Sequence, residues 1–124
     1  MIARRQDRRE GLRADVLGDL FLSISDEKSR FRGDAMNISA NGINFLSLTR
    51  LAMFHEVDVH LQLPGCHDGV KIKIHCHGIV VRCEHRVTPF FEVSLYFMDL
   101  SVADKHRIQK YIARLPLDAP LGPK

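Results

Sequence analysis

The sequence HEVDVHLQL at residues 55–63 decides the fold. Apolar residues occupy every second position, and polar or charged residues fill the positions between them: Val57, Val59, Leu61 and Leu63 alternate with Glu56, Asp58, His60 and Gln62. Successive side chains point to opposite faces of a strand. The stretch therefore predicts an antiparallel strand, His55–Leu63, with one buried face and one wet face.

Similar strand patterns lie on both sides of this stretch. They predict strands at Asp15–Ser25 (with a bulge or bend near Gly18), Phe31–Ile38, Gly42–Leu48, Val70–Glu84 and Pro89–Met98. In Val70–Glu84, Gly78 interrupts the alternation, so we expect a bulge there that moves Ile79, Val81 and Cys83 to the apolar side. Six strands with short links favour a small barrel, because closure removes exposed strand edges.

One helix is expected after the strands. Ser101 suits an N-cap, and apolar residues recur at helical spacing from there on: Ile108, Tyr111, Ile112 and Leu115. Pro116 and Pro120 would end the helix. The predicted fold class is mainly all-β: a six-stranded antiparallel barrel with a C-terminal helix over residues 14–115. A flexible arginine-rich arm at residues 1–13 precedes it, and a loose tail at residues 116–124 follows.

The composition limits the class of protein. With 124 residues, 45% of them hydrophobic and 27% charged, the chain has the size and balance of one globular domain. No segment approaches the roughly 18 apolar residues of a membrane span, and no apolar stretch follows the first arginines as in a secretory signal. Three cysteines cannot all pair within the chain. We expect a reduced, cytoplasmic protein without a membrane span.

The positive charge lies at one end of the chain. Residues 1–13, called the arginine arm here, hold five arginines and only two acidic residues, which accounts for the whole net charge of +3. The remaining residues are balanced between basic and acidic types. A neutral body with a cationic arm predicts an anionic partner bound at one place.

Two short motifs give that partner an identity. The arm contains R-R-x-x-x-R at Arg8, Arg9 and Arg13, and residues 37–42, called the motif loop here, read N-x-S-x-x-G. At these points the sequence resembles the PilZ domain family, receptors for the bacterial second messenger cyclic di-GMP. The resemblance extends to strand order, the aromatic-rich last strand and the Asp99-Leu100-Ser101 entry to the helix, over roughly residues 8–115. It implies a PilZ-like barrel on which the arm closes over a ligand seated at the motif loop.

The residue types suit such a ligand. Arginine forks bind phosphate oxygens or guanine O6 and N7. The Asn37 amide oxygen can accept from a guanine N–H, and the Ser39 hydroxyl can donate. Gly42 would supply a positive φ or let the backbone approach the ligand closely. Position 37 is Asn where Asp is commoner in the family, so this contact is a neutral and weaker hydrogen bond.

The arginine pattern fits in three frames: Arg4/Arg8, Arg5/Arg9 and Arg9/Arg13. We choose Arg9/Arg13, because the first expected strand starts directly after Arg13. Arg8 is then an accessory contact, which in related proteins with a doubled arginine can serve a stacked ligand dimer.

Other interpretations stay open. Arginine-rich termini often bind anions without specificity, and Asn, Ser and Gly are ordinary turn residues. A ligand-free PilZ-like module that only binds proteins is one alternative. A small barrel that binds RNA or single-stranded DNA is another, but the neutral body and the inward Phe91 and Phe97 lack the aromatic platforms of such proteins. No nucleic acid polymer is expected as a partner.

Neither catalysis nor metal binding is predicted. The segments Cys66-His67, His75-Cys76-His77 and Cys83-Glu84-His85 lack zinc-module spacing, and Cys76 points away from the two histidines that flank it. The chain has no phosphate-binding glycine motif and no nucleophile in a catalytic context. We expect a single-domain cyclic di-GMP receptor or adaptor without enzyme activity or cofactor. It would order its arm on binding and so change the surface shown to a downstream protein partner, which the sequence does not identify.

Overall fold

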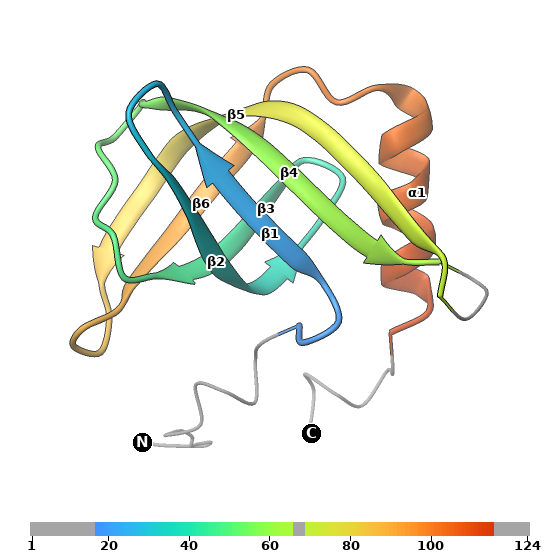
Figure 1. Ribbon diagram of the computed structural model, residues 1–124, viewed down its shortest axis with the longest axis horizontal. Coiled ribbons are helices and arrows are strands. Elements are labelled where there is room, and N and C mark those ends of the chain that lie inside the picture. The colour runs from blue at the N-terminus through green and yellow to red at the C-terminus, as the bar shows by residue number, and fades with distance from the viewer. Residues whose placement is uncertain (1–16, 66–68, 116–124) are drawn as a thin grey trace.

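The computed structural model describes residues 17–65 and 69–115, and it contains a barrel with one helix beside it (Figure 1). The elements are β1 (Phe21–Ser25), β2 (Arg30–Ile38), β3 (Gly42–Ser47), β4 (Glu56–Pro64), β5 (Lys71–His85), β6 (Phe91–Phe97) and α1 (Val102–Ala113). All strand pairs are antiparallel, and the strands close in the order β1-β2-β3-β6-β5-β4. This confirms the predicted fold class. The predicted arm and tail lie outside the described residues.

The barrel interior is formed by the alternating apolar residues. The four apolar residues of β4 are all buried, as are Val93, Leu95 and Phe97 of β6. Ile24 of β1, Phe45 of β3 and Val80 of β5 reach the same core and have no exposed surface. Each such side chain stabilises the fold by about 1.5–3 kcal/mol relative to leaving it in water.

Helix α1 begins as predicted. The Ser101 hydroxyl accepts the backbone N–H of Asp104 at 3.0 Å, and Ile108 and Tyr111 are buried. The Tyr111 hydroxyl donates to the Asp19 carboxylate at 2.8 Å, which ties the helix to the segment that leads into β1. Within the described part of the chain, no helix has the length and apolar character needed to cross a membrane.

The first strand is shorter than predicted. It begins at Phe21 rather than near Asp15, and Gly18 and Asp19 form a turn instead of a bulged strand. The chain turns there because the Leu20 N–H donates to the Leu17 carbonyl at 3.2 Å, which takes this segment out of the ladder. The other strand ends differ from the prediction by two residues at most.

The predicted bulge at Gly78 is wrong. Gly78 pairs regularly with Val57 on β4 and Phe97 on β6, and the register with β6 shifts later, between Val80 and Arg82. Val80 therefore stays inside the barrel, and Val81 points outward, where 44% of its surface is exposed. A second, unpredicted irregularity lies in β2 between Ala35 and Asn37.

Candidate functional site

The motif loop is a tight connection between β2 and β3. The Ser39 N–H donates to the Gly42 carbonyl at 2.9 Å, and the Asn41 N–H donates to the Ser39 hydroxyl oxygen at 3.1 Å. Ser39 thus shapes the turn through its oxygen, while its hydroxyl proton remains available to a ligand. Asn37 and Ser39 are both exposed.

A shallow hollow of about 290 Å³ opens on the outer barrel surface beside this loop. The motif residues Asn37, Ser39 and Gly42 all line it, so the structure brings together the described part of the predicted site. The remaining outward-facing wall was not predicted; it consists of Asn41, Asn44, Val81, Ser94 and Tyr96. These residues come from β3, β5, β6 and the loop, and only the pairing of those strands makes them neighbours. We call this feature the motif hollow.

Gly42 has a structural role that was not predicted. Its φ is not in the positive range, and a Cβ built there would lie 2.3 Å from the backbone oxygen of Leu95. Gly42 pairs with Tyr96 at the first rung of the β3–β6 ladder. A close approach between two strands of this protein therefore requires glycine at this position.

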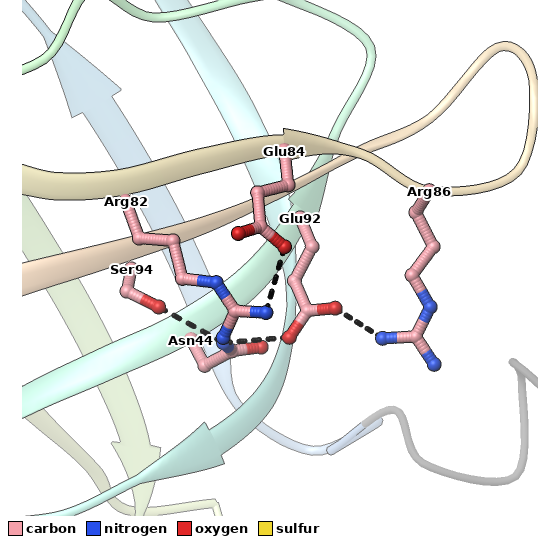
Figure 2. Close-up of polar contacts among 6 residues, drawn as sticks. All are labelled: Asn44, Arg82, Glu84, Arg86, Glu92 and Ser94. Atoms are coloured by element: carbon pink, nitrogen blue, oxygen red, sulfur yellow. Dashed lines mark hydrogen bonds and ion pairs between the residues drawn. The ribbon is translucent and has the colours of Figure 1, made fainter.

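A polar network contains two residues of the motif hollow, Asn44 and Ser94 (Figure 2). The Asn44 side-chain amide donates to a Glu92 carboxylate oxygen at 2.9 Å and to the Ser94 hydroxyl at 3.0 Å. Glu92 is also paired with Arg86, just beyond β5. Arg82 lies opposite Ser94 in the ladder and donates to Glu84 at 2.8 Å, an ion pair that lowers the pKa of Glu84.

Comparison with known proteins identifies the family to which this chain belongs. The model of the PilZ domain family matches residues 3–114, which is nearly the whole chain. This chain belongs to the PilZ domain family. Domains of this family are typically cyclic di-GMP receptors and generally act as binding or adaptor modules rather than enzymes.

One solved structure similar to this PilZ domain is that of the Bacillus subtilis inhibitor of motility (MotI/DgrA). The two share 19% sequence identity, with a TM-score of 0.66. The match covers 77% of this chain and 46% of that one, so this chain corresponds to under half of that protein. The likeness therefore concerns the fold. A search of curated proteins found no match.

The arginines of the predicted site, Arg8, Arg9 and Arg13, lie outside the described residues of this PilZ domain. The place where their segment joins the barrel is described, however. The Leu17 N–H donates to the Ala35 carbonyl at 2.6 Å, two residues before Asn37 on β2. Arg13 precedes Leu17 by four residues in the sequence.

A second, larger hollow of about 580 Å³ lies at the other end of β2 and contains none of the predicted site residues. Asp26, His55, Asp58 and His77 are among its lining. The Asp26 carboxylate accepts from the His55 ring at 2.9 Å and from the N–H groups of Lys28 and Ser29, and these bonds lower its pKa to about 2. We call this feature the acidic groove. Its carboxylates would repel a ligand that carries two negatively charged phosphates.

The histidines beside the acidic groove are paired with carboxylates or with one another. His77 contacts Asp99 through its ring Nδ1 at 2.6 Å and its backbone N–H at 2.7 Å, and its Nε2 lies 3.2 Å from Asp58. The rings of His60 and His75 stack with centroids 4.3 Å apart. Among residues 17–65 and 69–115, no group of three or more potential ligands is arranged to hold a metal. Cys76 points into the core, and burial raises the pKa of its thiol to about 12.

These contacts predict opposite pKa shifts for two of the histidines. The hydrogen bond that the His77 ring donates to the Asp99 carboxylate raises the pKa of His77 above 6.5, whereas desolvation and the neighbouring His75 lower that of His60. An NMR titration of the ring C–H signals should show His60 titrating at a lower pH than His77. Asp99→Asn should bring the His77 value down; an unchanged value would contradict the pairing.

The same contacts give stability a pH dependence of known sign. The pKa of His77 is raised by folding, so its stabilising effect is complete below the unfolded value and disappears as pH rises through the folded value. The pKa of Asp99 is lowered, so its effect is present above the unfolded value and is lost as pH falls through the folded one. The pair therefore contributes most in weakly acidic solution, between the two titrations.

Proposed function

We propose that this PilZ domain is a cytoplasmic receptor for cyclic di-GMP, which it binds between the motif hollow and the arginine arm. One observation carries the proposal. Leu17, the first described residue, is hydrogen-bonded to β2 two residues from Asn37, so the described chain begins beside the loop that completes the motif.

The charge of the described residues that line the motif hollow supports a site in which the hollow binds a base and the arm binds the phosphates. Cyclic di-GMP carries two phosphates and two guanines. The described residues that line the motif hollow include amides and hydroxyls but no lysine or arginine, so they suit the edges of a base better than a phosphate. The two phosphates then need cations from elsewhere. Arg9 and Arg13 supply these cations and form charge-assisted hydrogen bonds with the phosphates, and Arg8 is an accessory contact.

Binding in this way would change the molecular surface without chemistry on the ligand. The arm closes over the ligand and covers the motif hollow, which presents a new surface to a downstream protein. The domain is then an adaptor rather than an enzyme and requires no cofactor. The identity of the downstream protein is outside the proposal.

Isothermal titration of the full 124-residue chain with cyclic di-GMP tests the proposal. We expect saturable binding at micromolar or lower concentration, and much weaker binding of the linear dinucleotide pGpG. An absence of binding at tens of micromolar would contradict the proposal and favour the ligand-free interaction module. Equal binding of a linear oligonucleotide with a steep salt dependence would favour the nucleic-acid alternative.

A further inference from the structure

Tyr96 is the one aromatic side chain among the described residues that line the motif hollow. It lies on β6 directly opposite Gly42, and 53% of its surface is exposed. Gly42 has no side chain, so the Tyr96 ring has no cross-strand neighbour on the β3 side, whereas Ile79 is its partner on the β5 side. A planar apolar surface thus borders an open space whose other walls are amides and hydroxyls.

Asn44 stands beside this space in a fixed orientation. The carboxylate of Glu92 can only accept a hydrogen bond, so the Asn44 group that contacts it must be the NH₂. Ser94 accepts the second amide proton. Glu92, with a side chain only 12% exposed, is held in turn by Arg86 (Figure 2). Both donors of Asn44 are therefore used within the protein, and its carbonyl oxygen is left as an acceptor.

We propose that Tyr96 and Asn44 form a guanine subsite within the motif hollow. The base stacks on the Tyr96 ring, and the Asn44 carbonyl oxygen accepts from the N–H groups of its Watson–Crick edge. Aromatic stacking with hydrogen bonds to that edge is a common way for proteins to hold an unpaired base. This inference rests on the proposed function and assigns protein contacts to one base of that ligand.

The subsite also predicts selectivity between purines. The Watson–Crick edge of guanine presents two adjacent donors, N1–H and the exocyclic N2–H. Adenine presents one donor beside an acceptor, N1. The Asn44 carbonyl oxygen, whose own amide protons are both already used, therefore fits guanine, and it repels the N1 lone pair of adenine. We expect cyclic di-GMP to bind more tightly than cyclic di-AMP because of Asn44.

The direct test uses the tyrosines themselves. The chain has two tyrosines and no tryptophan, and the second, Tyr111, is buried. In protein with ring-labelled tyrosine, saturating cyclic di-GMP should shift the Tyr96 ring signals upfield by the ring current of the base. The Tyr111 signals should stay in place. An unmoved Tyr96 ring in a ligand-saturated sample would overturn the subsite.

Two sets of variants give an independent measure. Tyr96→Ser should weaken cyclic di-GMP binding about 5- to 150-fold, the usual effect of losing one stacked base. Tyr96→Phe should bind like the parent. Met98→Ser is the matched control, because Met98 lies two residues further along the chain, is exposed to a similar 45%, and is not part of the hollow. Asn44→Ala should reduce the preference for cyclic di-GMP over cyclic di-AMP, whereas general damage would weaken both ligands equally.

The outcomes separate the two proposals. If the parent chain does not bind cyclic di-GMP, both the proposed function and the subsite are wrong. If the parent binds and Tyr96→Ser binds equally tightly, the function stands and the subsite is wrong. If Tyr96→Ser does not fold, the ring shift in the parent chain decides alone.

Discussion

Replacing Arg9 and Arg13 together with alanine should abolish measurable cyclic di-GMP binding and leave thermal unfolding unchanged. A hydrogen bond to a charged group contributes about 1.5–3 kcal/mol, so the loss of two should weaken binding at least about 100-fold. Stability should not change, because both arginines precede Leu17 in the sequence, and among the described residues the hydrophobic core is formed by Leu17 and residues that follow it. Isothermal titration and a melting curve of the same sample measure both effects.

The matched control is Arg4→Ala/Arg5→Ala, which also removes two positive charges from the arm but at other positions. If Arg9 and Arg13 are specific contacts, this control should lose far less affinity than the Arg9/Arg13 variant. An equal loss in both variants would show that only the overall charge of the arm attracts the ligand. Undiminished binding by the Arg9/Arg13 variant would contradict the assigned frame altogether.

Gly42→Ala should destabilise the ligand-free domain by about 3 kcal/mol or more, at the upper end of overpacking costs. The new methyl group would meet the Leu95 backbone oxygen at 2.3 Å, and a backbone atom inside a ladder cannot move away as a side chain can. The first rung of the β3–β6 pairing must then open. For a domain of about 100 residues, this corresponds to a fall in melting temperature of 10 °C or more.

Gly18→Ala is the control for that substitution, because a Cβ at Gly18 meets no atom within 4 Å. Its melting temperature should stay close to that of the parent. If Gly42→Ala melted like the parent but no longer bound cyclic di-GMP, the glycine of the motif would serve the ligand directly, and the strand contact would not be its reason.

The sequence predicted the barrel well where one strand face alone decides the structure. In β4 and β6 the alternation of apolar residues identified the buried side chains. It failed at β5, where Gly78 and Val81 are both plausible places for a bulge. The choice depends on pairing with β6, which holds Gly78 in register and shifts the ladder after Val80. Such pairing joins residues far apart in the chain and is not visible in a single strand.

The same difference between local pattern and long-range pairing explains which residues of the site could be predicted. Asn37, Ser39 and Gly42 lie within six consecutive residues, so their pattern was readable, and the hollow confirms that they are neighbours. Asn44, Ser94 and Tyr96 join them only through the β3–β6 register. Each looked like an ordinary outward-facing residue in its own strand. Their place beside the motif loop follows from the closed barrel.

A two-dimensional ¹H–¹⁵N NMR titration with cyclic di-GMP tests whether the arginine arm and the motif hollow bind one ligand together. We expect three sets of amide signals to shift together and saturate together: residues 8–13, residues 37–44 and residues 94–96. Signals from the acidic groove, such as those of Asp26 and Glu56, should stay in place. Shifts confined to the arm, or shifts at the acidic groove in place of the motif hollow, would contradict this expectation.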